Sequence, residues 1–205
     1  MSTRGLVAVF YKGKYRIAQR QWCDAYPKKP GCGVAILEFL QRWDRDKFCR
    51  NLLRTWLVDD VDALPDPSVE EFQGMDALVA VADLAEDTPD LVFMSSLEFA
   101  ANSLFCEWAY VIDLDTNTFE VYFGLNPLPV PHAQRFAELP VRMLYKQQYE
   151  DQKQYFQVQF LRKWYLRKLP LVSAFEATCT RLEAKFRRER YEQMKKLGRT
   201  ARDSL

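Results

Sequence analysis

Two stretches of the chain alternate apolar and polar positions in the manner of β-hairpins. In residues 6–18, β-branched and aromatic residues flank Lys12 and Gly13, and in residues 110–123 a similar alternation flanks a polar turn at 115–118. Glycine readily adopts the positive backbone φ that a tight hairpin turn requires. The two hairpins together predict a four-stranded antiparallel sheet.

Other segments repeat apolar residues every three or four positions, which is the period of an amphipathic helix. Helices are expected at residues 36–56 (one or two helices), 68–85 (after a capping box at 68–71), 95–105, 140–169 and 173–197. A short strand is expected at residues 91–94. Gly198 is expected to end the last helix. The pattern predicts an α+β fold, an antiparallel sheet from two hairpins packed by helices, with basic helices at the C-terminus.

The length of 205 residues suits one α+β core domain over residues 1–140, with a helical C-terminal extension over 141–205 packed on it. A chain of this size buries about 70% of the surface that its unfolded form exposes. The five cysteines form no CxxC pair, and no apolar leader follows Met1, so we expect a reduced, cytoplasmic protein. No apolar run reaches the roughly 20 residues of a membrane span, so no membrane partner is expected.

Charge is distributed unevenly along the chain. Residues 59–90 contain acids and no lysine or arginine, whereas residues 162–202 carry thirteen lysines and arginines against four glutamates. A basic helix interspersed with aromatic residues suits an RNA backbone and unstacked bases. The alternative is a solvated helix that partly neutralises itself. The single histidine, His132, has no second histidine or cysteine pair beside it, so we expect neither a metal nor another cofactor.

Functional groups are densest between the first hairpin and the helix that follows it. Residues 22–27 contain an indole ring, a thiol, a carboxylate, a phenol and a proline. After them, Gly31-Cys32-Gly33 leads into an apolar helix. Backbone N–H groups at a helix start can hold an anion, and glycines allow a ligand to approach closely. The alternative is structural: the rings cover the hairpin and the glycines separate two elements.

The first interpretation of these residues is an enzyme whose pocket is built from the N-terminal unit. Its residues are Asp24, Tyr26 and Glu38 as catalytic groups, Arg4, Trp22, Gly31 and Gly33 as substrate-binding groups, and Arg187, Arg188, Arg190, Lys195 and Lys196 as nucleic-acid-binding groups. A second interpretation is an N-terminal-nucleophile-like amidohydrolase that uses a free amine near Thr3. A third is a non-catalytic module that binds nucleic acid or protein through its charged segments.

Several motifs resemble those of small fungal and bacterial proteins of unassigned function. These motifs are Thr3-Arg4-Gly5-Leu6, Trp22 with Asp24-Ala25-Tyr26-Pro27, the Gly-x-Gly before residues 36–40, and the strands at 110–115 and 119–122. Cys23 and Ala25 depart from the W-D-G-Y-P turn of that group. In its size, its basic helix and its surplus of acids, the chain also resembles fungal arginine-containing cyclodipeptide synthases. No catalytic motif matches residue by residue. That resemblance implies a transferase that takes aminoacyl groups from tRNA, and so an aminoacyl-tRNA partner. It also implies a carboxylate, such as Asp24 or Glu38, that pairs with an arginyl guanidinium.

Overall fold

A computed structural model describes residues 3–59, 72–141 and 155–202, with side chains described as far as residue 196. The elements in chain order are β1 (Gly5–Tyr11), β2 (Lys14–Gln21), α1 (Cys32–Arg42), α2 (Arg45–Leu52), β3 (Thr55–Val58), α3 (Gly74–Asp83), β4 (Leu91–Met94), the 3₁₀ helix η2 (Leu97–Ala101), β5 (Trp108–Asp113), β6 (Thr118–Phe123), β7 (Gln159–Tyr165), the 3₁₀ helix η3 (Leu166–Lys168) and α4 (Val172–Arg202). The predicted α+β class is confirmed.

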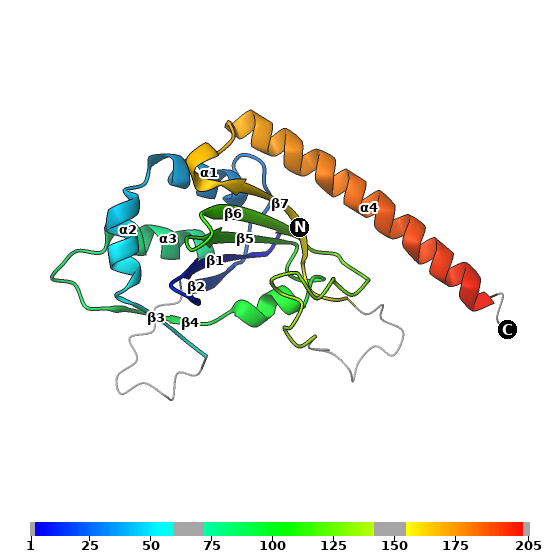
Figure 1. Ribbon diagram of the computed structural model, residues 1–205, viewed down its shortest axis with the longest axis horizontal. Coiled ribbons are helices and arrows are strands. Elements are labelled where there is room, and N and C mark those ends of the chain that lie inside the picture. The colour runs from blue at the N-terminus through cyan, green and yellow to red at the C-terminus, as the bar shows by residue number, and fades with distance from the viewer. Residues whose placement is uncertain (1–2, 60–71, 142–154, 203–205) are drawn as a thin grey trace.

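The main sheet has five strands in the order β2-β1-β5-β6-β7. Both predicted hairpins are present, and both are antiparallel. They join through a parallel pair, β1 with β5, in which Gly5 lies opposite Trp108 and Phe10 lies opposite Asp113. β7 adds a further antiparallel strand beside β6 (Figure 1). The sheet is therefore mostly antiparallel and ends in two edge strands, β2 and β7.

The turn of the first hairpin has the backbone geometry that its sequence predicts. Lys12 and Gly13 both have positive φ, 53° and 74°, which is the combination that a two-residue hairpin turn requires. The carboxylate of Asp115, in the turn of the other hairpin, accepts hydrogen bonds of 2.8 Å from both of their N–H groups. The two turns are thus tied together at one end of the sheet.

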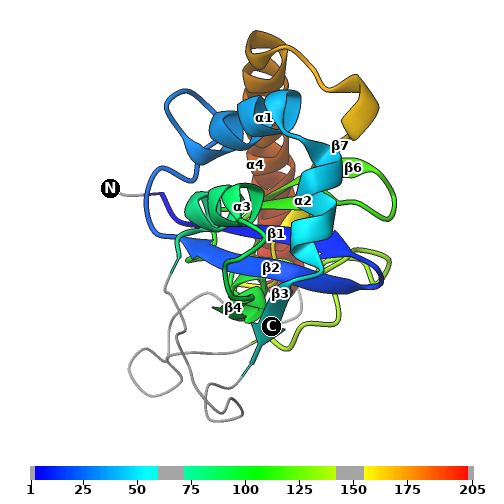
Figure 2. The ribbon, with the colours of Figure 1, turned by 90° about the vertical axis from the view of Figure 1, so that its left-hand side faces the viewer.

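The two faces of the sheet are covered by different parts of the chain. Helices α1, α3 and α4 pack on one face, where Val7, Ile36, Tyr110 and Phe175 belong to a single buried cluster. Figure 2 shows α1 and α3 over this face with α4 behind them. On the opposite face, η2 and the segment around Phe136 cover a smaller cluster. Both faces of the central strands β5 and β6 are therefore buried.

A second, two-stranded parallel sheet lies beside β2. It pairs β3 with β4, so that Thr55 lies opposite Leu91 and Val58 lies opposite Met94. The strand predicted at residues 91–94 is confirmed as β4. Residues 55–58 are also a strand, which corrects the prediction that the second amphipathic stripe continues as a helix through Trp56.

Three other local predictions need correction. Residues 159–165, expected in a long helix over 140–169, form β7, while residues 142–154 lie outside the described part. The sheet thus extends past the predicted boundary at residue 140. The helix expected at 95–105 is the short 3₁₀ helix η2, and α4 continues through Gly198 to Arg202. The capping box predicted at residues 68–71 lies outside the described residues, and α3 begins at Gly74.

Within the described residues, no helix combines the length and the apolar character that crossing a bilayer requires.

Candidate functional site

The predicted catalytic residues lie around the loop between β2 and α1. Asp24 is exposed and has a φ of 52°, and its carbonyl oxygen accepts a hydrogen bond of 2.7 Å from the Cys32 N–H. Tyr26 is half-buried. Glu38, on α1, forms an ion pair of 3.4 Å with the ammonium of Lys29. These contacts hold the loop to itself and to α1, and the described hydrogen bonds and ion pairs link none of the three predicted catalytic side chains to another.

The two glycines of the helix start allow the chain to approach itself. The Gly33 N–H donates to the Tyr26 carbonyl at 3.3 Å, and a Cβ on Gly33 would lie 2.6 Å from the Tyr110 hydroxyl oxygen. A Cβ on Gly31 would collide with the same Tyr26 carbonyl. The space beside both glycines is therefore filled by protein atoms. A catalytic role for Asp24, Tyr26 and Glu38 stays a prediction.

The two predicted substrate-binding side chains, Arg4 and Trp22, lie in different places. The Arg4 guanidinium carbon is 4.7 Å from the centre of the Phe105 ring. Trp22 is 53% exposed and lines a cavity beside β2, where the guanidinium of Arg20 lies over its ring.

The predicted nucleic-acid-binding residues of α4 divide into two groups. Arg187 pairs with Glu183 at 2.9 Å and lies over the Phe123 ring, and Arg190 lies over Phe186. Burial lowers the pKa of the Arg190 guanidinium, and the charge of Glu189 offsets this in part. Arg188, Lys195 and Lys196 are exposed. The guanidinium groups of Arg187 and Arg190 therefore lie over aromatic rings, although Arg187 is still exposed to solvent.

The strongest concentration of charged side chains near a surface hollow is on β5, β6 and the segment after them. Arg135 bridges two carboxylates: its Nη2 donates to Asp113 and its Nε donates to Glu120 at 2.9 Å. Burial would lower the pKa of this guanidinium, but the hydrogen bonds and charges of its carboxylate partners raise it above its ordinary value. Arg135 is thus a permanent counter-ion for both acids.

Both oxygens of Glu120 are occupied by hydrogen bonds. Oε2 accepts 2.6 Å from the Tyr122 hydroxyl and 2.9 Å from Arg135, while Oε1 accepts 3.2 Å from Arg135 and 3.3 Å from Thr118. Burial, together with the charge and hydrogen bond of Glu120, raises the pKa of Tyr122 well above its ordinary value. The tyrosine therefore remains a neutral donor. A carboxylate held by four donors is suited to positioning its neighbours.

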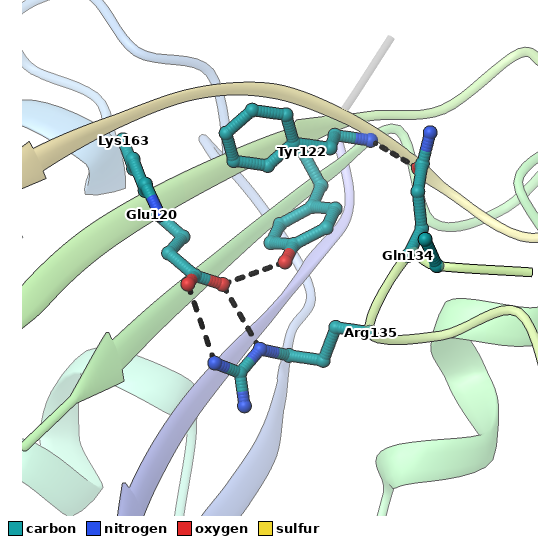
Figure 3. A pocket seen from close by; sticks show the side chains of 7 residues that line it. Glu120, Tyr122, Gln134, Arg135 and Lys163 are labelled. Carbon is teal, nitrogen blue, oxygen red and sulfur yellow. Dashed lines mark hydrogen bonds and ion pairs between the residues drawn. The ribbon is translucent and has the colours of Figure 1, made fainter. Parts of the chain in front are cut away.

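A pocket of about 410 Å³ opens above this network. Figure 3 shows Glu120, Tyr122, Gln134, Arg135 and Lys163 around it, with Glu120 directed towards Arg135 and Tyr122. Lys163 is exposed and comes from β7, opposite Glu120 in the pairing of β6 with β7. In the described part of the chain, no ion pair holds its ammonium. Lys163 is therefore the cation that this pocket offers to a ligand.

A second pocket of about 410 Å³ lies at the far end of β7. Its lining residues are Arg45, Thr116, Asn117, Tyr165 and Arg167. Arg45 donates to the Asn117 side-chain oxygen, and the Arg167 guanidinium carbon is 5.8 Å from the centre of the Tyr165 ring. This lining has two guanidinium groups and no carboxylate, so it favours an anion.

One side of β7 connects the two pockets. Phe160 packs edge-on against Tyr122, and Trp164 packs against Phe175 on the opposite side. Side chains alternate along a strand, and the register shift between Val121 and Tyr122 adds one residue to β7, so Phe160 and Lys163 both lie on the side of β6 that carries Tyr122 and Glu120. Tyr165, two positions after Lys163, shares that side. Phe160 is 36% exposed and Tyr165 is 55% exposed. We call the surface formed by Phe160, Lys163, Tyr165 and the flanking Arg45 and Arg167 the β7 face.

The sequence interpretation missed this surface because residues 159–165 were assigned to a helix. The signal that favours a strand is the short run Gln159–Tyr165, which has three aromatic residues and ends before η3 and Pro170. No local sequence pattern could identify Arg135 as part of this site, because its partners Asp113 and Glu120 lie 22 and 15 residues away along the chain.

Comparisons with known proteins return no match: no family model, no curated protein and no solved structure resembles this chain. Within the described residues, no group of three or more histidine, cysteine, aspartate or glutamate side chains is arranged to hold a metal ion.

Proposed function

We propose that this chain is a nucleic-acid-binding module that holds single-stranded RNA across the β7 face. The observation that carries the proposal is the alternation of exposed rings and cations along β7 and into η3: Phe160, then Lys163, then Tyr165 on the strand, then Arg167 in η3. Aromatic side chains stack on unpaired bases, and lysine and arginine neutralise the phosphates between them.

The charges around this face support the same ligand. The linings of the two pockets contain four cations, Arg45, Arg135, Lys163 and Arg167, and one carboxylate, Glu120. Glu120 and the nearby Asp113 share the single guanidinium of Arg135, so these three groups together carry one negative charge. Arg45, Lys163 and Arg167 outweigh it. A phosphate backbone on the β7 face would meet a positive surface.

A purely structural role for these cations is the competing explanation. Charged side chains on an edge strand prevent sheets from pairing with one another, and β7 is such a strand. That role accounts for Lys163 but does not require exposed rings beside it. Tyr165 therefore discriminates between the two explanations better than any lysine does.

Aminoacyl transfer from tRNA, which the resemblance implies, requires a catalytic group in addition to RNA binding and is a separate prediction. The observed contacts of Asp24 and Glu38 are explained by the local structure of the β2–α1 loop and by Lys29. The amidohydrolase alternative concerns an N-terminal amine at residues that lie outside the described part.

The decisive experiment measures binding of a fluorescent single-stranded oligouridine to the full chain by anisotropy, over a series of salt concentrations. We expect Tyr165→Ala to weaken binding by roughly 1 to 3 kcal/mol, the value of one stacked base. We expect Lys163→Gln to reduce the slope of log K against log salt by about 0.7, because one phosphate contact is lost.

Trp56→Leu is the matched control, because Trp56 is 53% exposed and lies on β3, away from the β7 face. Unchanged affinity of Tyr165→Ala would refute the proposal. If Arg188→Gln with Lys195→Gln abolished binding while Tyr165→Ala had no effect, the ligand would lie on α4, as the sequence interpretation predicted.

A further inference from the structure

The pocket at the far end of β7 is built by three segments that are distant in sequence. Thr118 pairs with Tyr165 in the register of β6 with β7, so the turn before β6 lies at the end of β7. The Leu166 N–H donates to the Asn117 carbonyl oxygen at 2.9 Å, and Arg45, the first residue of α2, donates to the Asn117 side-chain oxygen. The turn and the start of α2 therefore form a wall that closes the β7 face at this end.

The two guanidinium groups of this pocket keep their positive charge available. Arg45 is bonded to the neutral amide of Asn117, and the guanidinium carbon of Arg167 lies 5.8 Å from the centre of the Tyr165 ring. In the part of the chain that the structure describes, neither guanidinium forms an ion pair. Both side chains are exposed. An anion in the pocket would therefore meet two cations that no carboxylate of the described residues already holds.

Acidic residues adjoin the pocket in sequence, but none of them is among its lining residues. The carboxylate of Asp44 caps the N-terminus of α2, and that of Asp115 bonds to the turn of the first hairpin. Asp46 lies in the first turn of α2. All three are exposed, so solvent and salt screen their charges. The other lining residues of the turn, Thr116 and Asn117, are uncharged, so the pocket favours concentrated negative charge.

A terminal phosphate of a nucleic acid matches this pocket better than an internal phosphate does. A phosphate monoester has three acceptor oxygens and about 1.5 to 2 negative charges at neutral pH. An internal diester has a single charge, and it continues into the strand on both sides. Paired N–H donors of arginine bind phosphate oxygens two at a time, so two guanidinium groups gain more from the monoester. A pocket closed by a wall also suits the end of a strand.

We propose that this pocket binds the terminal phosphate of the RNA strand that lies on the β7 face. The inference rests on the proposed function, because the last base stacks on Tyr165 and this brings its phosphate beside Arg45 and Arg167. The ring of Tyr165 is 55% exposed and lines the same pocket. The other pocket of the β7 face includes the carboxylate of Glu120 in its lining. The strand therefore lies on the face in one direction.

The test measures binding of fluorescent oligouridines to the full chain by anisotropy. Three have the same length and carry a 5′-phosphate, a 3′-phosphate or hydroxyl groups at both ends. A fourth has hydroxyl ends and is one nucleotide longer, which adds an internal phosphate. We expect a phosphate at one end only to tighten binding by about tenfold relative to the hydroxyl-ended strand, through charge-assisted hydrogen bonds. The longer strand should gain much less.

The affinity ratio of the phosphorylated to the hydroxyl-ended strand isolates the pocket from the rest of the face. Arg45→Lys and Arg167→Lys keep the charge and lose the planar fork, so each should lower this ratio by roughly threefold. Arg50→Lys is the matched control, because Arg50 is an exposed arginine at the other end of α2 and outside the lining. Lys163→Gln should weaken both strands by the same factor and leave the ratio unchanged.

Equal tightening by a phosphate at either end would indicate a general effect of charge and would overturn the inference. Equal affinity of phosphate-ended and hydroxyl-ended strands would also overturn it, as would a ratio that Arg45→Lys and Arg167→Lys change no more than Arg50→Lys does. In these cases the hydroxyl-ended strand still binds and the proposed function stands. If no oligouridine binds, the proposed function fails, and the inference fails with it.

Discussion

The β2–α1 loop and the β7 face contain similar residue types and use them in opposite ways. In the loop, backbone groups of Asp24, Tyr26 and Gly33 bond to other groups of the loop or of the start of α1. On the β7 face, the ammonium of Lys163 and the ring of Tyr165 point to solvent beside open pockets. A dense cluster of functional residues in a sequence is therefore a weak guide to a site, because the chain itself is the first partner available to each group.

The largest effect is expected at the network beneath the β7 face. Arg135→Met removes the counter-ion of Asp113 and Glu120, which are 2% and 8% exposed, and leaves two buried carboxylates without compensation. We expect the free energy of unfolding to fall by about 3 to 5 kcal/mol, as measured by urea denaturation. Arg45→Met, at an exposed position, is the control. A loss no larger than that of the control would mean that Arg135 is available to a ligand and is not a structural group.

The next effect tests whether the β2–α1 loop is packed against itself. Gly33→Ala places a Cβ 2.6 Å from the Tyr110 hydroxyl oxygen and 2.8 Å from the Pro27 Cα. We expect a loss of about 1 to 3 kcal/mol in unfolding free energy, because both neighbours are held in the core. Ala35→Gly, on the partly exposed side of α1, measures the cost of a change in the same helix without a clash. If Gly33→Ala were as stable as wild type, the loop would have room for a ligand.

The smallest expected effect is the pH dependence of stability that arises from the ion pairs of Arg135 with Asp113 and Glu120. Burial raises the pKa of Asp113, but hydrogen bonds from Thr116 and Arg135 and the charge of Arg135 more than offset it, so the folded pKa lies below its ordinary value of 3.8. This stabilisation is present above about pH 4 and is lost as the pH falls towards the folded pKa. Urea denaturation between neutral and acidic pH should show a flatter profile for Asp113→Asn than for wild type. Parallel profiles would show that the interaction of Asp113 with Arg135 does not contribute to the free energy of unfolding.

Local patterns sufficed for elements whose partners are close in sequence. The hairpin turn at Lys12 and Gly13, the strand at Leu91–Met94 and most of α4 follow from turn chemistry or hydrophobic period. Residues 159–165 could not be assigned in this way, because the aromatic residues that favour a strand there also continue the helical pattern predicted over residues 140–169. Pairing with β6 makes this segment a strand. The same pairing places Lys163 opposite Glu120 and so creates the candidate site.

The sequence by itself determined the α+β class, the two hairpins and the separation of acidic and basic segments, because these depend on neighbours within a few residues. Only the tertiary structure decided which polar groups stay accessible. In the folded chain, Tyr110 fills the space beside Gly33 and Arg135 pairs with Glu120. Lys163 and Arg20 lie beside open cavities. Accessibility depends on contacts between residues far apart in the chain, and no local pattern encodes those contacts.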